Sequence, residues 1–499
     1  MYQDDRSART GTIAWGGDVN IGRRFHYRFE HANACDALAR ITPLGSADLS
    51  IVNLECVVAT RGAENLNKGE RASFYFRARP EMLETLIRGN VDLVATANNH
   101  SGDYGPQALL EQTMWLDKAG IGQAGSGPDL EAALQPTIRR AGALDVALFS
   151  IDATQESFAA AEDRPGIAWL DPRNPEAWRT IIEPRISEAR KQADVVIVAM
   201  HWGANNRHAP DAREIEGGHA LIDAGADAVV GASAHLLQGI EIYKNRPILH
   251  DAGDLLFDAL SRSDNDSGVF TLDLDHRGVT AVRFTPLEIG FCSTKVLSGQ
   301  AATDAVRRFA RKCKALGVHL KPTGHGQGLI DLQPPERPVP ALRTPPAVLE
   351  KRGVMAIGAP RPEWLADDVP PDARFAEPLN VGPLELLGLR VSPERVEHLS
   401  NLAIESWWRS PKQVDCDWRI DFRATSDHPA TVGDWGRSSS HDPCDWMWPL
   451  QRWTPGKIYR DFYTLRPSSV TNWLDSTLTL SVGLVSHQGK TDRVTLPRK

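Results

Sequence analysis

The first 290 or so residues alternate short apolar runs, rich in β-branched side chains, with segments of helical periodicity. The apolar runs are TIAWGGDV (12–19), DLSIVNLECVV (48–58), VDLVATA (91–97), VALFSI (146–151), DVVIVAM (194–200) and DAVVGA (227–232). Helical segments between them include 80–89, 106–120 and 213–226. Apolar strands separated by helices are typical of α/β folds, in which helices cover the faces of largely parallel sheets. We therefore expect an α/β fold, which a hairpin over 268–289 completes.

The character of the sequence changes after this region. One amphipathic helix is expected over 301–318, and the stretch 331–348 is rich in proline. Nine of the 14 tryptophans follow residue 360, where short β-rich runs replace the helical periodicity. We predict an α/β domain over 1–330, a linker over 331–372, and an antiparallel β-sandwich over 373–499. Its tryptophans either pack in a core or form a platform for carbohydrate or peptide.

Composition excludes several classes of protein. The net charge of −8 disfavours a nucleic-acid partner. The N-terminal stretch lacks the apolar centre of a secretory signal, and no run of about 18 apolar residues predicts an integral membrane span. The six cysteines contain no CxxC pair and are expected to be reduced thiols. We expect a cytoplasmic protein, and the sequence leaves its oligomeric state open.

Polar side chains follow the predicted strands at the points where they end. In open α/β folds, ligands bind at the carboxyl ends of the strands. Carboxylates, amides and imidazoles in this mixture suit a divalent metal such as Mn, Fe, Zn or Ca. Any one of them has an ordinary alternative: Asp103 is expected in a turn, and Asp254 as a helix cap. The residues that recur at strand ends are Asp18, Asn20, Glu55, Asn98, Asn99, His100, His201, Asn205, His235 and Asp254.

The order of these motifs resembles the CapA family of the calcineurin-like metallophosphoesterase superfamily. The matching words are GDVNIGR (17–23), NLE (53–55), FYFRARPEMLETL (74–86), ATANNHSGDYG (95–105), HWG (201–203) and GIEIYKNRPILHDAGDLLFD (239–258). The resemblance implies an αββα metallophosphoesterase-like sandwich with a metal site at the sheet edge. It implies metal ligands at Asp18, Glu55, Asn99, His201 and His235, and catalytic roles for His100, His235 and Asp18. The residues that we expect to contact substrate lie in or just after these words and are Asn20, Arg23, Trp202 and Asn205.

Two positions depart from the superfamily pattern. Asn20 stands where the superfamily has the histidine of Asp-x-His, and Ser233 stands where it has the first histidine of the Gly-x-His-x-His pattern. Both changes remove nitrogen donors, so we expect one divalent metal per chain and no organic cofactor.

The family resemblance leaves several functions open. The first is a metal-dependent enzyme that acts on a peptide or polyglutamate-like substrate, which would be its partner. The second is a cofactor-independent peptide epimerase of a ribosomal (lasso-type) peptide pathway, in which acid/base groups move an α-proton with help from a metal. The third is a phosphoester hydrolase, which favours two metals about 4 Å apart. The fourth is a binding protein without catalytic activity.

Overall fold

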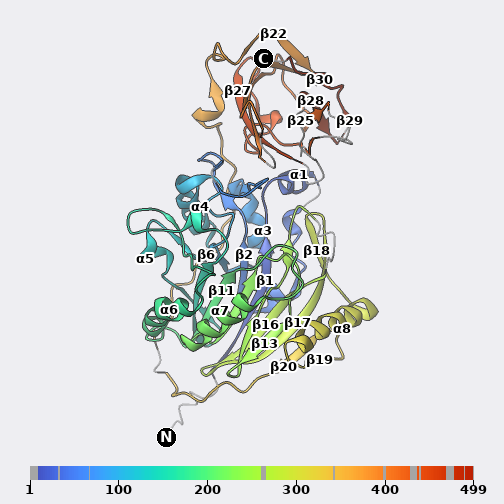
Figure 1. The fold of residues 1–499 in the computed structure, drawn as a ribbon. Helices are drawn as coiled ribbons and strands as arrows, with labels where there is room; N and C mark the ends of the chain where they lie inside the picture. Colours follow the sequence, from blue (N-terminus) through green and yellow to red (C-terminus); the bar gives the residue numbers. More distant parts are fainter. Residues whose placement is uncertain are drawn as a thin grey trace. The chain divides into compact units, whose positions relative to one another are not determined.

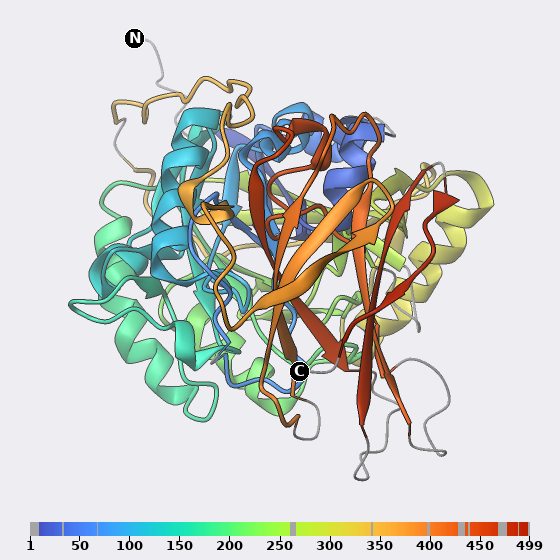
Figure 2. The same ribbon diagram turned by 90° about the horizontal axis from the view of Figure 1, so that it is seen from above.

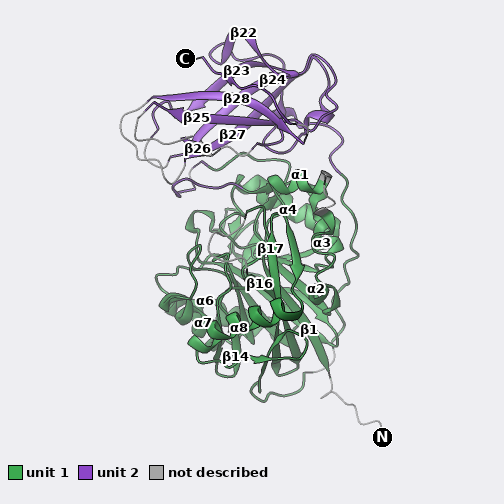
Figure 3. Ribbon diagram, turned by 90° about the vertical axis from the view of Figure 1, so that its right-hand side faces the viewer, with its two compact units in different colours: residues 1–65, 76–355 green, residues 66–75, 356–499 purple. Residues whose placement is uncertain are grey.

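The computed structural model describes residues 9–31, 34–66, 68–259, 266–340, 343–396, 400–427, 435–437, 440–467, 477–487 and 489–497. The chain divides into two compact units, of which unit 1 comprises 1–65 and 76–355 and unit 2 comprises 66–75 and 356–499 (Figure 3). The mixed α/β architecture with several sheets is confirmed. The domain limits 1–330, 331–372 and 373–499 stay a prediction.

The first sheet of unit 1 has its strands in the order β19-β20-β17-β16-β1-β2-β5-β6, with β15 paired to β1 and β18 paired to β17. Strands β1, β2, β5 and β6 run parallel, whereas β16 pairs antiparallel with both β1 and β17. The strands are β1 Thr10–Val19, β2 Leu49–Leu54, β5 Leu93–Ala95, β6 Gly122–Ala124, β15 Asp254–Leu256, β16 Asp266–Asp275, β17 Gly278–Gly290, β18 Ser293–Val296, β19 Lys321–Pro322 and β20 Gly328–Asp331.

The second sheet of unit 1 has the order β13-β14-β12-β11-β9-β8. Its central strands β14, β12, β11 and β9 are parallel, and the edge strands β13 and β8 pair antiparallel. The strands are β8 Thr137–Ala141, β9 Leu144–Asp152, β11 Val195–His201, β12 Ala228–Ala232, β13 Ile240–Tyr243 and β14 Arg246–Leu249. Two short pairs complete unit 1, formed by β3 Val57–Val58 with β4 Arg77–Ala78 and by β7 Ser126–Gly127 with β10 Gly166–Ile167.

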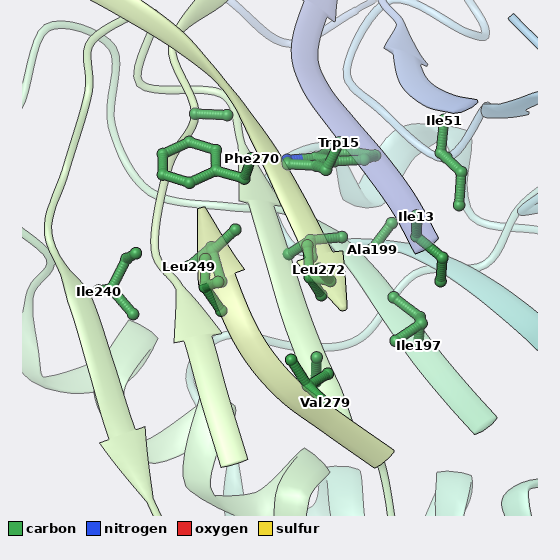
Figure 4. Close-up of a cluster of buried hydrophobic side chains, with 14 of the residues drawn as sticks. Ile13, Trp15, Ile51, Ile197, Ala199, Ile240, Leu249, Phe270, Leu272 and Val279 are labelled. Carbon is green, nitrogen blue, oxygen red and sulfur yellow. The ribbon is translucent and has the colours of Figure 1, made fainter. Parts of the chain in front are cut away.

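The two sheets pack against each other around one hydrophobic core (Figure 4). Trp15 and Ile51 enter it from the first sheet, and Ile197 and Ala199 enter it from the second. The indole Nε1 of Trp15 donates to the carbonyl of Gly231 at 3.1 Å, which links the sheets by a buried hydrogen bond. Burial on both faces explains why these strands carry almost uninterrupted apolar runs.

Strand β11 shows how one run serves two cores. Its alternate residues Ile197 and Ala199 face the core between the sheets, whereas Val196 and Val198 face a second core. Helices α6 and α7 line that second core, to which Trp178 contributes. The helices of unit 1 are α1 Arg24–His31, α2 Thr42–Ser46, α3 Glu84–Arg88, α4 Gly105–Ala119, α5 Leu130–Ala133, α6 Glu176–Ala189, α7 Ala212–Asp223 and α8 Gly299–Ala315.

Helix α8 lies along the strands β17, β19 and β13 (Figures 1 and 2, yellow). Its apolar stripe, Val306, Phe309 and Cys313, packs into the core between the sheets. The opposite face carries exposed arginine and lysine side chains, which is the pattern of an amphipathic surface helix.

The proline-rich segment after β20 belongs to unit 1 as far as residue 355. Cationic side chains fasten it to buried or half-buried carboxylates of that unit. Arg337 pairs with Asp227, and Arg343 Nη1 lies 2.8 Å from Asp194 Oδ1. Further along, Lys351 Nζ lies 2.7 Å from Asp92 Oδ1. The sequence predicted a spacer here. Its ion pairs hold the described residues of 332–355 against the rest of unit 1, and we call this segment the strap.

The strap predicts different stabilities for two truncated chains. Ending the chain at residue 335 would remove Arg337 and Arg343 and leave the buried carboxylates Asp194 and Asp227 with fewer cationic partners. Removing part of the compensation of a buried carboxylate destabilises the folded chain, so we expect residues 1–355 to unfold at a higher urea concentration than residues 1–335. Urea titration followed by circular dichroism measures the difference, and equal midpoints would contradict the role of the strap.

Unit 2 contains two antiparallel sheets, β21-β27-β24-β23-β22 with β26 on β27, and β25-β28-β29 with β30 on β28. Both contribute to one core, which includes Trp408 of β24 and Phe422 of β25. The strands are β21 Leu365–Ala366, β22 Arg374–Val381, β23 Leu384–Ser392, β24 Leu402–Arg409, β25 Arg419–Ser426, β26 Gly436–Arg437, β27 Ile458–Pro467, β28 Leu478–Ser486, β29 Gly489–Lys490 and β30 Val494–Thr495.

The burial of the unit 2 tryptophans bears on whether they pack in a core or form an exposed binding platform. Trp473 lies outside the described residues, and Trp418 is half-buried. The other seven are buried, which favours core packing over an exposed aromatic platform; they are Trp364, Trp407, Trp408, Trp435, Trp446, Trp448 and Trp453. In the described part of the chain, no helix has the length and apolar character needed to cross a membrane.

Candidate functional site

Parallel strands of both sheets end at the same edge of unit 1 and bring their polar residues together. Because the sheets face each other, the ends of strands distant in sequence become neighbours. The side chains that the sequence predicted to be ligands or catalytic groups come from β1, from the turn after β2, from the loop after β5, from the end of β11 and from the loop after β12. They are Asp18, Glu55, His100, His201 and His235.

The carboxylate of Glu55 lies among three imidazoles and is buried. Its Oε1 is 3.9 Å from Nε2 of His100 and 3.9 Å from Nε2 of His201, and its Oε2 is 3.8 Å from Nδ1 of His235. These separations exceed hydrogen-bond length. Two ligands that each lie ~2.1 Å from a shared ion are about 3–4 Å apart, so the spacing fits a cation between these groups.

Asp18 and His235 form the second half of the cluster. Asp18 Oδ1 accepts a hydrogen bond from Asn53 Nδ2 at 2.7 Å, and Asp18 Oδ2 accepts one from the Ser233 amide at 3.1 Å. His235 Nδ1 lies 3.4 Å from Asp18 Oδ2 and 2.8 Å from Asp254 Oδ1. The ligand atoms of Asp18, His235 and Asp254 all lie within 4.8 Å of one another, which is compact enough to surround one ion.

Backbone geometry at two places brings these groups together. Gly17 has φ +77°, and a Cβ at this position would meet the carbonyl oxygen of Gly253 at 2.2 Å, so only glycine lets β1 approach that closely. In the loop after β12, Ser233 and His235 adopt φ values of +117° and +59°. Non-glycine residues held in such conformations are concentrated at functional sites.

The electrostatics of the cluster favour a positive charge at its centre. Burial raises the pKa of the Asp18 carboxyl, but the hydrogen bond from His235 and the charges of His235 and His201 outweigh it and lower that pKa. Burial lowers the pKa of His235, but the carboxylates Glu55 and Asp254 raise it well above its ordinary value. The carboxylates therefore hold a proton on His235, where a metal ion would supply the same compensation.

The two adjacent asparagines after β5 have different surroundings. Asn98 Nδ2 donates to Asn53 Oδ1 at 3.2 Å and to the Leu54 carbonyl at 2.9 Å, and its Oδ1 accepts from the His100 amide at 3.1 Å. Asn98 therefore braces the strand ends. The Oδ1 atom of Asn99 is buried and makes no hydrogen bond within the described residues. A buried amide oxygen of this kind needs a partner, and a cation would be one.

His100 is held by a carboxylate and an aromatic ring. Its Nδ1 lies 2.6 Å from Asp103 Oδ2, which also accepts a hydrogen bond from the Phe76 amide at 2.7 Å. The Phe76 ring stacks on the imidazole at a centroid separation of 3.8 Å, and the Phe257 ring packs edge-on against Phe76 at 5.7 Å. Asp103 thus fixes the ring so that Nε2 points to Glu55.

The residues expected to contact substrate differ in their burial and in their contacts. Asn20 is buried, and its Oδ1 accepts from the Gly22 amide at 2.8 Å. The guanidinium of Arg23 pairs with Asp258 and lies over the Phe76 ring at 4.1 Å, so this side chain supports the wall beside His100.

The expectation for Trp202 needs correction, because its indole packs in the core under α6 and α7 and donates to the His250 carbonyl at 2.8 Å. An indole buried in this way presents no face to a substrate. Asn205 is exposed in the loop that follows β11, and its expected contact with substrate stays a prediction.

Sequence reasoning missed two carboxylates of the cluster. Asp103 lies in a turn as expected, and Asp254, expected as a cap, begins β15; their direct contacts with His100 and His235 were not predicted. For Asp103 the i,i+3 spacing from His100 was the available signal. For Asp254 there was only its place in the motif HDAGD, because its proximity to His235 depends on the pairing of β15 with β1.

The carboxyl of Glu214 on α7 packs against the loop that follows His201. Glu214 Oε2 accepts from the Asp211 amide at 2.7 Å in a capping box. At Gly203, which has φ +81°, a Cβ would lie 2.0 Å from Glu214 Oε1. Burial raises the pKa of Glu214 from 4.5 to about 7, so its carboxyl keeps its proton to higher pH in the folded protein.

This pKa predicts a pH-dependent effect of Glu214→Gln. Between pH 4.5 and about 7 the folded state binds a proton on Glu214 that the unfolded chain releases, so this group's contribution to stability falls as pH rises. Glutamine keeps the cap acceptor and does not ionise. We expect the free energy of unfolding of the variant to match that of the wild type near pH 5 and to exceed it by about 2 kcal/mol at pH 8. Denaturant titrations at both pH values test this, and a pH-independent difference would contradict it.

Comparison with known proteins adds a family to this geometry. A family model described as "Bacterial capsule synthesis protein PGA_cap" matches residues 12–259, a range that contains all the cluster residues named above. The PGA biosynthesis protein CapA of Bacillus subtilis (strain 168) is 29% identical over 291 residues, which cover 58% of this chain and 73% of that protein.

Two further relatives match parts of the chain. A probable polyglutamine synthesis accessory protein of Mycobacterium tuberculosis (strain ATCC 25618 / H37Rv) is 34% identical over 221 residues, which cover 43% of this chain and 56% of that protein. The capsule biosynthesis protein CapA of Bacillus anthracis is 24% identical over 313 residues, which cover 62% of this chain and 74% of that protein. The chain thus spans little more than half the length of the mycobacterial relative.

Proposed function

Because the chain belongs, through residues 12–259, to the bacterial capsule synthesis protein family, we propose that it is a metal-dependent enzyme that acts on a peptide or poly-glutamyl substrate. The observation that carries the proposal is Glu55, whose two oxygens lie 3.8–3.9 Å from nitrogen atoms of three histidines. The name of the relative from Bacillus subtilis, which refers to PGA biosynthesis, supports an acidic glutamyl polymer as the substrate. The name of the relative from Mycobacterium tuberculosis refers to polyglutamine synthesis, which supports a polymer of a related amino acid.

The donor set fits one divalent ion. The buried Oδ1 of Asn99, without a hydrogen-bond partner among the described residues, is an available ligand. Carboxylate and amide oxygens together with imidazoles suit Mn, Fe or Zn, and Ca if the oxygens dominate. Asp18, Glu55, Asn99, His201 and His235 would hold the ion, and Asp254 would join them. One ion is proposed because Asn20 and Ser233 stand where the superfamily pattern has histidines, and Ser233 offers Asp18 a backbone amide.

The chain's own residues divide the remaining work. A bound ion would supply Lewis acidity and a lowered pKa for water. Asp103 holds His100 by Nδ1, which leaves Nε2 as the atom that exchanges a proton with the substrate. For cleavage of an amide bond, His100 would protonate the departing nitrogen. The Phe76 ring covers one side of this imidazole and excludes water there, and the Phe257 ring packs edge-on against Phe76.

One observation favours phosphoester hydrolysis as a second candidate. Glu55 directs Oε1 toward His100 and His201 and Oε2 toward His235. A carboxylate between two donor groups is the geometry of a bridging ligand, and two ions about 4 Å apart are the usual arrangement for phosphoester cleavage. The number of ions bound therefore separates the two candidates.

The test uses the full chain, purified without chelator and also reconstituted with Mn, Fe(II), Zn or Ca. Elemental analysis gives the number of ions, and mass spectrometry follows γ- and α-linked glutamyl oligomers incubated in D2O. We expect one ion per chain and metal-dependent shortening of an oligomer. Two ions with cleavage of a phosphodiester would replace the proposal with the second candidate. Deuterium uptake at an α-carbon without shortening would indicate the peptide epimerase alternative. A chain that binds no divalent ion would refute all three.

A further inference from the structure

A cavity of about 390 Å³ lies in unit 1 between helix α8 and the loop that follows His201. Its apolar part includes Pro210 from the loop and Leu316 from the end of the helix. Its polar part is cationic and consists of Arg308, Arg311 and Lys312, with His208 beside them. The volume is within the range of small-ligand sites. No carboxylate is among the residues that line it, although the chain as a whole carries a net charge of −8.

The positive charges of the cavity are only partly compensated. Arg308 is engaged by Asp266, with Nη2 and Oδ1 2.6 Å apart. Arg311 and Lys312 form no ion pair with any described residue, and the Arg311 side chain is exposed. Two cations placed one residue apart at the rim of a cavity attract an anion more strongly than the same charges spread over a flat surface.

The mixed lining indicates which anion fits. Pro210 and Leu316 offer apolar surface next to the charges of Arg311 and Lys312. A glutamyl side chain has a short methylene stem and a terminal carboxylate, so it can cover the apolar surface while its carboxylate meets the cations. Inorganic phosphate has no apolar part to match. The chemistry thus points to an aliphatic carboxylate.

The loop that forms one wall of the cavity begins at the proposed metal site. It leaves β11 at His201, and its Asn206 amide donates to the carbonyl of Ala234, the neighbour of His235, at 2.8 Å. Gln238 Nε2 donates to the Arg207 carbonyl at 3.0 Å, one residue before His208. Short, hydrogen-bonded chain segments therefore join the cavity to the segments that carry two proposed ligands.

We propose that this cavity is a second, non-catalytic subsite, which binds the carboxylate of one glutamyl-type unit while another unit of the same acidic chain lies at the Glu55 cluster. The identity of the polymer rests on the proposed function, whereas the carboxylate preference rests on the cavity itself. Such a subsite would favour chains of several acidic units over single ones, because binding at two places on one chain multiplies affinity.

The test compares two double variants of the full chain that lose the same charge from the same helix. Arg311→Ala/Lys312→Ala removes the uncompensated cations of the cavity. Arg307→Ala/Lys314→Ala is the control, since neither residue lines the cavity and Arg307 already pairs with Asp304 at 3.2 Å. Fluorescence anisotropy measures the binding of a labelled glutamyl oligomer, and melting temperatures confirm that both variants fold.

We expect the cavity variant to bind the oligomer at least about tenfold more weakly, because it loses one or two charge-assisted hydrogen bonds. We expect the control to bind within about twofold of the wild type. Equal losses in both variants would show diffuse attraction to the helix and overturn the subsite. Competition by tripolyphosphate as effective as that by an acidic oligomer of equal charge would overturn the carboxylate preference. Metal content is measured on the same samples. A metal-free, inactive chain that still shows the tenfold difference would refute the proposed function and leave the subsite standing.

Discussion

Asp18→Asn should abolish both metal binding and turnover while the chain stays folded. Asparagine keeps an oxygen that can accept from Asn53 Nδ2, now 2.7 Å from Asp18 Oδ1, but it removes the negative charge that faces His235. Loss of a residue that only supports a ligand typically costs 10–100-fold in metal affinity, so loss of a charged ligand should cost more than about 100-fold. Isothermal titration with Mn or Zn and elemental analysis measure the change.

The control for this variant is Asp117→Asn, an exposed carboxylate on α4. It should leave metal content, turnover and melting temperature unchanged. Asp18→Asn protein that keeps a full equivalent of metal would remove Asp18 from the ligand set. A variant that loses metal only because it unfolds would show a collapsed melting transition, which the paired melting curve detects.

His100→Ala should lower turnover by about 10²–10⁴-fold while metal content stays near the wild-type value. The imidazole is held by Asp103 through Nδ1, and its Nε2 stays 3.9 Å from Glu55, so its expected task is proton exchange with the substrate. Turnover on the substrate identified above, metal content and melting temperature are measured together. Added imidazole should restore part of the turnover, because a free base can enter the space left by the ring.

Two results would contradict this role. If His100→Ala strips the metal as thoroughly as Asp18→Asn, the imidazole is a ligand. If melting temperature falls but turnover per folded molecule does not, His100 only braces the loop over 101–105. Asp103→Asn serves as the matched variant, since it removes the charge that orients the ring and should lower turnover less than His100→Ala, with an altered pH profile.

Much of unit 1 could be predicted from hydrophobic pattern alone. The runs at 12–19, 146–151, 194–200 and 227–232 all form strands, because a strand covered on both faces needs apolar residues at nearly every position. The helix expected over 301–318 forms as α8, since its apolar residues recur on one face. The CapA family relationship is confirmed by the match to residues 12–259.

The same pattern could not reveal contacts that join distant segments. The strap is an example: proline content indicated a linker, but the pairs of Arg337 with Asp227 and of Lys351 with Asp92 fasten it to unit 1 as far as residue 355. The local sequence of 66–75 does not indicate that this segment belongs to unit 2. There the backbone carbonyl of Ser73 accepts a hydrogen bond from Asn401 Nδ2 at 3.1 Å. Ion pairs and hydrogen bonds between such segments leave no periodic signal.

By itself, the sequence determined which residue types stand at the strand ends, because apolar runs fix the strands and the polar residues that interrupt them are visible in one dimension. Only the tertiary structure decided which of these side chains meet. Packing two sheets around one core placed His201 and His235 beside Glu55. The pairing of β15 with β1 brought Asp254 to His235, and burial turned Trp202 into a core residue. Distance and burial are properties of the packed chain, and they decide whether a carboxylate is a cap or part of a cation site.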